Sequence, residues 1–218
     1  MRPELLSESI QDYLKEIYKL AVGGERATTT AIARRLGVSA PSVTAMLKKL
    51  AVLGLVVHEP YHGATLSETG ERIAVEVVRH HRLLELYLMQ TLGMSIEDVH
   101  AEADRLEHAL SEELEARIDA ALGFPTHDPH GDPIPDAELR MATPALRALD
   151  ALEPGERAVI RRVPDDAVAL RTLRELELLP GCEIELLTLG TADELLTVSS
   201  GGAEHAIERE LAGRIGVS

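Results

Sequence analysis

The sequence is poor in the features that mark exported, membrane-embedded and disulfide-stabilised proteins. It has one cysteine in 218 residues, Cys182, so no internal disulfide can form and no Cys/His zinc spacing is available. It has no run of about 18 apolar residues, the length that a membrane helix needs. Its opening segment lacks the apolar core of a signal peptide. We therefore expect a globular protein of the cytoplasm that does not enter a membrane.

The chain also lacks the short signatures of common catalytic sites. It contains no HExxH, no GxSxG and no Gly-rich phosphate loop, and we find no nucleophile near the polar clusters discussed below. A histidine with two carboxylates can still serve a metal-dependent hydrolase, so this alternative stays open. A regulator that senses a small organic ligand is another. The missing signatures favour a protein that is not an enzyme.

Acidic residues outnumber basic ones, but unevenly along the chain. The formal net charge is −15 at pH 7, yet residues 1–65 hold 8 basic against 6 acidic residues, leaving 14 against 31 for the rest. Between residues 26 and 65 a single acid, Glu59, faces five bases: Arg26, Arg34, Arg35, Lys48 and Lys49. This distribution predicts a local cationic patch on an acidic protein that avoids coating DNA indiscriminately.

The N-terminal region has the pattern of a winged helix-turn-helix. Apolar residues at helical spacing predict a helix over 8–22. Threonine start signals, a break near Gly37 and a new start at Ser39 predict a short helix, a turn and a second helix that Gly54 ends. Two β-prone runs over 55–67, about a turn with Pro and Gly, predict a small hairpin as the wing.

The middle of the chain predicts helices, and its end predicts a small β-rich domain. A long helical pattern covers 67–92, and a second begins at Ser95 and continues to Gly123 with a break near Ser111. A Pro-rich loop follows at 124–135. From about residue 155, β-prone runs predict strands in RAVIRRV, CEIELLTL and ELLTVSS, with a short helix over 166–178.

The segment VHAEADRLEH at 99–108 concentrates side chains that bind cations. At about 100° per residue, four of them fall on one face of an α-helix, beside an apolar stripe: His100, Asp104, Glu107 and His108. Carboxylates and imidazoles half-buried together need a partner. Upstream, His81 and Glu85 stand one helical turn apart, a spacing that can ligate one cation. Antiparallel helices would bring the two faces together, which favours a metal site over solvated hydrogen bonds.

Another histidine-rich segment, THDPHGD at 126–132, is open to the same interpretation. Its prolines and its loop setting favour solvated turn residues instead.

The expected recognition helix begins with small residues. Its N-terminal end would lie in the major groove of DNA, but it offers no Arg, Asn or Gln for a bidentate base contact. We expect Ser39 and Pro41 to lie at the bases. We expect phosphate contacts from Ser42, Thr44, Lys49 and His62.

Several of these segments, in this order, resemble the diphtheria toxin repressor family of iron- and manganese-dependent regulators. The resemblance covers nearly the whole chain and rests on DYLKEIY, VSAPSVTAMLKKL, HRLLE, VHAEADRLEH and HGDPIP, followed by a domain similar to the family's SH3-like module. It implies a primary metal site at Asp12, Asp104, Glu107 and His108. It implies an ancillary site at His81, Glu85 and His100, with Asp166 near a further ligand position.

Two positions bear on the metal. Iron-sensing relatives have Met and Cys where this chain has Asp12 and Asp104. Manganese-sensing relatives, like this chain, have carboxylates at these positions. Oxygen ligands suit Mn²⁺ best and Fe²⁺ almost as well. Short manganese regulators use Glu for a paired second metal where this chain has Lys15, and an ammonium cannot ligate.

The sequence thus predicts a mainly α protein with a small β domain. We expect a winged helix-turn-helix over 1–72, a helical metal-binding and dimerisation domain over 73–140, a linker over 141–154 and an SH3-like barrel over 155–218. The resemblance implies a homodimeric, Mn²⁺-activated regulator of double-stranded operator DNA that represses metal-uptake genes, with Fe²⁺ as the alternative ion.

Overall fold

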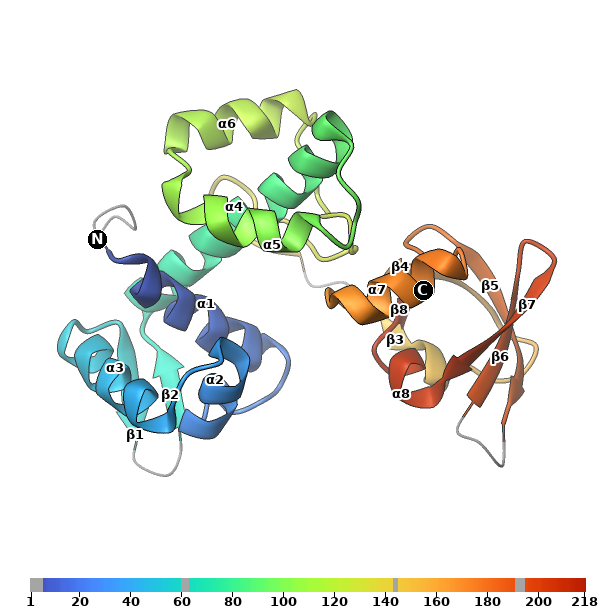
Figure 1. Cartoon of the computed structure of the whole chain (residues 1–218), viewed down its shortest axis with the longest axis horizontal. Helices are drawn as coiled ribbons and strands as arrows, with labels where there is room; N and C mark the ends of the chain where they lie inside the picture. The colour runs from blue at the N-terminus through green and yellow to red at the C-terminus, as the bar shows by residue number, and fades with distance from the viewer. Residues whose placement is uncertain (1–5, 60–62, 143–144, 191–194) are drawn as a thin grey trace. The chain divides into compact units, whose positions relative to one another are not determined.

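The computed structural model describes residues 6–59, 63–142, 145–190 and 195–218 (Figure 1). The described chain divides into two compact units. The first is drawn from Met1–His81, Asp104–Arg117 and Pro135–Arg140, and the second from Arg82–Ala103, Ile118–Ile134 and Met141–Ser218. No described helix is both long and apolar enough to cross a membrane.

The first unit opens with three helices whose ends match the sequence signals. Helix α1 spans Glu8–Val22, α2 spans Thr29–Leu36 and α3 spans Ala40–Val52. The Thr28 side chain accepts a hydrogen bond from the Ala31 amide at 3.1 Å, and Ser39 accepts one from the Ser42 amide at 3.3 Å, so each hydroxyl caps its helix. Gly37 ends α2 in the left-handed conformation with φ 64°. The predicted helix-turn-helix is confirmed.

The wing is an antiparallel hairpin of β1 (Val56–Glu59) and β2 (Gly63–Leu66). Its turn lies outside the described residues. Side chains from all three helices and the hairpin share one apolar core: Ile10, Tyr13, Leu14, Ile17, Leu20, Ala27, Ile32, Val43, Leu47, Leu50, Leu55, Val56, Ala64, Ile73 and Ala74. The helical periods and β-prone runs of the sequence therefore converge on a single buried cluster.

The next region contains α4 (Glu68–Leu92), α5 (Val99–Leu106), the 3₁₀ helix η2 (Glu107–Ala109) and α6 (Glu112–Ala121). The expected start of the second helix was wrong in detail. The second helix begins at Val99, because Ser95 turns the chain by accepting the Asp98 amide on its carbonyl and donating its hydroxyl to the Asp98 carboxylate. The α-helix ends at Leu106 and tightens into η2, which the sequence did not predict, whereas the break predicted near Ser111 is confirmed between η2 and α6.

The C-terminal region is a six-stranded antiparallel sheet in the order β3-β8-β4-β5-β6-β7. Its strands are β3 (Arg147–Ala148), β4 (Arg157–Arg162), β5 (Glu183–Leu189), β6 (Leu195–Ser200), β7 (Ala203–Glu208) and β8 (Gly216–Val217). The 3₁₀ helix η3 (Leu149–Ala151), α7 (Ala167–Glu175) and α8 (Arg209–Ala212) complete it. The three predicted strands and the helix are confirmed, whereas β3, β7 and β8 lacked a pattern long enough to predict them.

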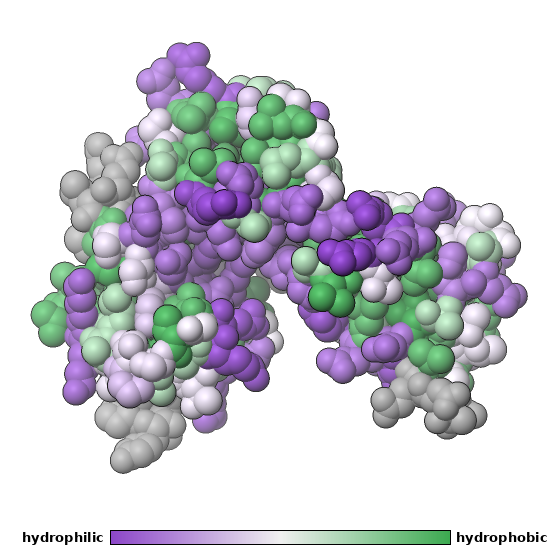
Figure 2. Space-filling model, in the orientation of Figure 1, coloured by the Kyte–Doolittle hydropathy of each residue, from purple (hydrophilic) through white to green (hydrophobic). Residues whose placement is uncertain are grey.

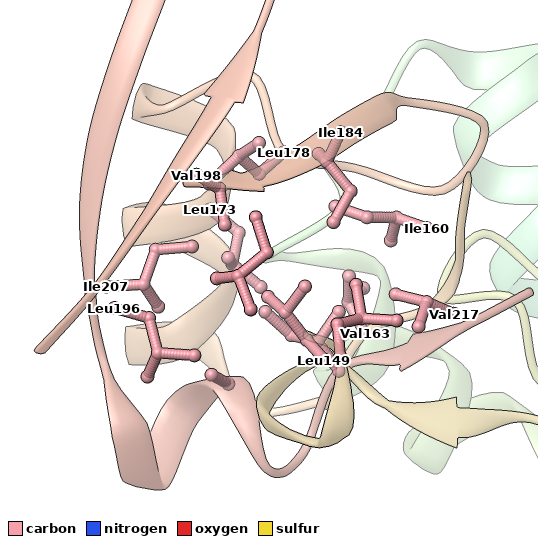
Figure 3. Close-up of a cluster of buried hydrophobic side chains, with 14 of the residues drawn as sticks. Leu149, Ile160, Val163, Leu173, Leu178, Ile184, Leu196, Val198, Ile207 and Val217 are labelled. Carbon is pink, nitrogen blue, oxygen red and sulfur yellow. The ribbon is translucent and has the colours of Figure 1, made fainter. Parts of the chain in front are cut away.

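The core of this β domain is aliphatic (Figure 3). Leu173 from α7 and Leu178, which follows α7, lie near Val198 of β6, and Leu196 of the same strand lies beside Ile207 of β7. Ile96, which lies between α4 and α5, belongs to the same core and is 8% exposed. The core of the β domain therefore extends beyond the residues that form its strands.

Candidate metal centre

The first cluster of candidate ligands joins α1 to η2 and α5 within the first unit. The first cluster consists of Asp12, Asp104, Glu107 and His108. His108 Nε2 lies 3.0 Å from Asp12 Oδ1, and His108 Nδ1 lies 2.8 Å from Gln11 Oε1. Ligand atoms of Asp12, Glu107 and His108 lie within 4.8 Å of one another. The structure thus brings residues about 95 positions apart into the range of a single ion.

Lys15 supplies a positive charge to this cluster. Its Nζ donates to Asp104 Oδ1 at 2.8 Å and to Glu107 Oε1 at 2.5 Å. Burial lowers the pKa of Lys15, but Glu107 and Asp104 outweigh that effect and hold it above its ordinary value. Lys15 is therefore a cation in the described structure, which places it as the counter-charge of two candidate ligands.

Glu107 is the most enclosed member of the first cluster, with a side chain that is fully buried. Its second oxygen, Oε2, lies 2.6 Å from His81 Nδ1, and His81 also lies 3.3 Å from Asp104 Oδ1. His81, which the family resemblance assigns to an ancillary site, therefore contacts Glu107 and Asp104, which the same resemblance assigns to the primary site.

The hydrogen bond with Asp12 raises the pKa of His108; burial opposes this shift and Glu107 adds to it. Three carboxylates and an imidazole form a set that fits a divalent cation, and oxygen-rich sets suit Mn²⁺. The side chains of Glu107 and His108 are buried, whereas those of Asp12 and Asp104 are 40% and 45% exposed.

The 3₁₀ turn η2 explains how neighbouring residues both reach α1. Residues in this helix advance about 120° each, so the direction of Glu107 and His108 differs from that in a continued α-helix. His80 holds the turn, because its Nδ1 lies 3.1 Å from the Glu107 carbonyl oxygen while its Nε2 lies 2.9 Å from Glu115 Oε2. The single helical face expected for 99–108 is thus wrong beyond Leu106.

A second cluster lies within the second unit and consists of Glu85, Asp128 and His130. All three residues are buried, with His130 only 1% exposed, and their ligand atoms lie within 4.8 Å of one another. Glu85 Oε2 is 3.5 Å from His130 Nδ1, while Glu85 Oε1 is 3.0 Å from His100 Nδ1. His130 Nε2 has no hydrogen-bond partner among the described residues. The interpretation of this loop as solvated turn residues was wrong.

The loop is buried because its own turn and the β domain satisfy its backbone. Asp128 Oδ1 accepts the amides of His130 and Asp132, both at 2.9 Å, which is the local signal of an aspartate-initiated turn. The Val163 amide donates to the His130 carbonyl at 2.9 Å. Gly131 has φ +88°, and a Cβ there would lie 1.8 Å from the Arg161 carbonyl oxygen.

The second cluster gathers buried carboxylates and basic groups, and the carboxylates carry its negative charge. Burial raises the pKa of Asp128 to about 7, and the Glu85 carboxylate adds to this shift. Burial lowers the pKa of His130, but its hydrogen bond to Glu85 and nearby carboxylates raise it to about 9. Arg82 Nε, at 3.5 Å from Asp128 Oδ2, offsets part of that charge. A group of this kind binds either protons or a cation.

Asp166 and Asp165 differ in their surroundings. Asp166 caps α7 by accepting the Ala169 amide at 2.9 Å and also pairs with Arg214. Asp165 instead contributes to the raised pKa of His130. The residue before Asp166 is therefore the one that acts on the second cluster.

The expected DNA-contacting residues gather at the start and along the outer face of α3. Ser39, Pro41, Ser42 and Lys49 are exposed, and the hydroxyls of Ser39 and Ser42 lie 2.8 Å apart. Thr44 is half-buried and donates its hydroxyl to the Ala40 carbonyl at 3.1 Å. The sixth expected contact, His62, lies outside the described residues.

Family models match three successive parts of the chain. Residues 5–64 match the iron-dependent repressor N-terminal DNA-binding domain, and 67–136 match the iron-dependent repressor metal-binding and dimerisation domain. Residues 147–218 match the FeoA domain. The order of these matches follows the order of the elements described above.

Relatives and solved structures match over almost the full length. The chain is 31% identical to the diphtheria toxin repressor of Corynebacterium diphtheriae over 218 residues, with 95% of each chain covered. It is 29% identical to the iron-dependent repressor IdeR of Mycobacterium leprae over 220 residues, again with 95% of each covered.

Among solved structures, a manganese-dependent transcriptional repressor in complex with manganese is 38% identical with a TM-score of 0.89, covering 95% of this chain and 98% of that one. The manganese regulator SloR is 30% identical with a TM-score of 0.80, and 96% of this chain and 97% of that one are covered.

Proposed function

Because the chain belongs to the iron-dependent repressor family, whose members are metal-dependent DNA-binding repressors of transcription and not enzymes, we propose that it is a Mn²⁺-activated repressor of metal-uptake genes. It acts in the cytoplasm on double-stranded operator DNA, as a homodimer. Fe²⁺ is the alternative ion. Family membership excludes the alternative function of a metal-dependent hydrolase, which the sequence analysis left open.

The composition of the first cluster carries the choice of metal. Its candidate ligands are the carboxylates of Asp12, Asp104 and Glu107 and the imidazole of His108, and none of them is a sulfur ligand. Mn²⁺ lies at the weak end of the divalent affinity order, so a protein that responds to it needs hard oxygen ligands that limit the advantage of softer competitors.

The mechanism follows from the elements that supply the ligands. Asp12 comes from α1, which packs in the core of the helix-turn-helix, whereas Glu107 and His108 come from η2. A cation shared by these residues would hold the two segments in one arrangement. In a homodimer this would fix the spacing of the recognition helices, which must be about 34 Å to read successive major grooves. A coupling of about 1–3 kcal/mol would change operator affinity roughly 5- to 150-fold.

We assign a supporting cation site to the second cluster. Glu85, Asp128 and His130 are buried together, and His130 Nε2 has no hydrogen-bond partner in the described part of the chain, so it is available to bind a cation. The ancillary set implied by the family resemblance shares Glu85 with this cluster and adds His81 and His100. Under this proposal Glu85 is the ligand common to both sets.

The domain limits stay part of the proposal. Residues 1–72 bind DNA, 73–140 bind metal and dimerise, and 141–154 link this region to the SH3-like barrel of 155–218. The end of the linker, in β3 and η3, also contributes to the sheet and core of the barrel. Large apolar side chains are exposed on the helical region, namely Leu92, Leu114 and Phe124. Figure 2 shows hydrophobic surface over α6. This exposure supports dimerisation through the helices that follow the wing.

Titration of operator binding tests the proposal. Fluorescence anisotropy of labelled operator DNA, measured with Mn²⁺, with Fe²⁺ under anaerobic conditions and with a chelator, should show tight binding with Mn²⁺ and its loss with the chelator. Equal binding in all three conditions would refute metal activation. A response to Fe²⁺ at lower free concentration than to Mn²⁺ would replace the proposed ion by the alternative one.

A further inference from the structure

Lys15 lies among the carboxylates of the first cluster although it cannot be a metal ligand. It comes from α1, is only 5% exposed, and reaches Asp104 and Glu107 on the segments that face α1. An ammonium has three donor hydrogens and no lone pair. It therefore binds carboxylate oxygens as a small cation does, and it occupies space that another cation would need.

We propose that Lys15 is a built-in cation of the first cluster, which limits the cluster to one divalent ion and weakens the affinity for that ion. The inference rests on the proposed metal-activated function. It adds a residue that sets the metal concentration at which the protein responds, without being a ligand.

The charges of the cluster support one divalent ion. Three carboxylates, those of Asp12, Asp104 and Glu107, and the ammonium of Lys15 leave two negative charges when the imidazole is neutral. One divalent ion neutralises them. Without the ammonium, a third negative charge would stay unbalanced next to the fully buried Glu107 side chain, which favours a second cation.

The contacts divide the cluster into two sides. On one side Lys15 fills the position between Asp104 Oδ1 and Glu107 Oε1, and His81 lies against Glu107 Oε2. On the other side Asp12 and His108 lie 3.0 Å apart. Glu107 borders both sides, because its Oε1 is also 3.5 Å from His108 Nε2. The metal position therefore borders Asp12, Glu107 and His108, while Lys15 occupies one oxygen of Asp104 and one of Glu107.

Calorimetric titration of the metal-free full-length protein with Mn²⁺ tests the inference without DNA. All proteins carry Glu85→Gln, so that the second cluster contributes little binding. In this background the parent should bind one ion per chain in the first cluster. Lys15→Gln should bind Mn²⁺ at least about tenfold more tightly, since a unit charge close to the ion is removed. Lys19→Gln, one helical turn further along α1, is the matched control and should keep the parent's affinity.

A charge-conserving variant and the thermal stability separate this role from simple packing. Lys15→Arg keeps the positive charge and should stay within about threefold of the parent's affinity. The stabilisation that Mn²⁺ gives, measured as the rise in Tm, should be larger for Lys15→Gln than for the parent.

The inference fails if Lys15→Gln binds Mn²⁺ with the parent's affinity, if Lys15→Arg tightens binding tenfold, or if the parent itself binds two ions in the first cluster. The last two results decide the matter even if Lys15→Gln does not fold. A parent that binds no Mn²⁺ would instead refute the proposed function.

Discussion

His108 and Asp12 meet across 96 positions of the sequence, with the imidazole Nε2 at 3.0 Å from the carboxylate Oδ1. One residue comes from the helix that begins the DNA-binding region and the other from a 3₁₀ turn after α5. This contact is the point at which a cation would join the two regions.

Removal of a ligand of the first cluster should abolish metal activation and leave the fold intact. We expect Glu107→Gln and His108→Ala each to lose Mn²⁺-activated operator binding, because each removes a ligand but none of the buried apolar core. Anisotropy titrations with Mn²⁺ measure the loss, and circular dichroism with sedimentation verifies a folded dimer. Glu113→Gln, an exposed position on α6, is the control. A Mn²⁺ response of the Glu107 variant equal to the parent's would show that the assignment is wrong.

Replacement of the two aspartates by sulfur ligands should shift the metal preference. Asp12→Met with Asp104→Cys removes two anionic oxygens and adds a thioether and a thiol, so activation by Mn²⁺ should fall more than activation by Fe²⁺ or Co²⁺. Operator binding, titrated anaerobically with each metal at fixed pH and salt, measures the ratio. An unchanged ratio of Mn²⁺ to Fe²⁺ activation would show that residues other than Asp12 and Asp104 determine the metal preference.

Lys49 should contribute to DNA affinity through phosphates. It is exposed on α3, and the start of this helix offers no bidentate base reader. Lys49→Ala should weaken binding to operator and random DNA alike and reduce the slope of log affinity against log salt by about 1. Arg157→Ala, on an exposed strand position of the β domain, should leave both unchanged. Loss of discrimination with an unchanged salt slope would contradict a phosphate contact.

The second cluster should bind its own ion. His130→Gln removes a buried imidazole whose Nε2 lacks a partner among the described residues, so calorimetry should register one Mn²⁺ fewer per chain than for the parent. His127→Gln is a close control, because His127 is exposed in the same loop. Identical stoichiometry for the two variants would exclude His130 as a ligand.

Gly131 should be intolerant of any side chain. An alanine there would adopt φ +88° and place its Cβ 1.8 Å from the Arg161 carbonyl oxygen. We expect Gly131→Ala to destabilise the protein by about 2–4 kcal/mol, the sum of left-handed strain and overpacking. Gly123→Ala shares the positive φ but meets nothing within 4 Å, so it should cost only about 1–2 kcal/mol. Denaturant unfolding of both variants gives the two losses in the free energy of unfolding. Equal losses would show that the loop moves away from the added Cβ without further destabilisation.

The sequence predicted those elements whose signals are local. Capping residues such as Thr28 and Ser39 and the apolar period of α1 and α4 gave helices at nearly the observed bounds. The end of α5 at Leu106 was missed, because the 3₁₀ turn depends on tertiary contacts such as the one between His80 and the Glu107 carbonyl. Propensity along the chain does not report such a contact.

In the two clusters, too, local sequence patterns were predicted and tertiary contacts were not. The histidines and carboxylates of 99–108 were visible as a pattern, although the pairing of His81 with Glu107 was not. Asp128 and His130 were assigned to a solvated turn because prolines surround them. Their burial results from a turn closed by Asp128 and from the strand residues that cover it. The presence of a distant covering element could not be inferred from composition.

Ile96 limits how freely the β domain can be moved between proteins. It packs in the core with residues such as Leu149 and Leu170, and Glu97 beside it pairs with Arg174 Nη1 at 2.9 Å. A gene segment that encodes residues 147–218 alone would leave a hole where Ile96 sits and expose the neighbouring leucines to water. A free-standing copy of residues 147–218 should therefore be less stable than the same residues in the full chain, because it lacks the short connection between α4 and α5 that fills this part of the core.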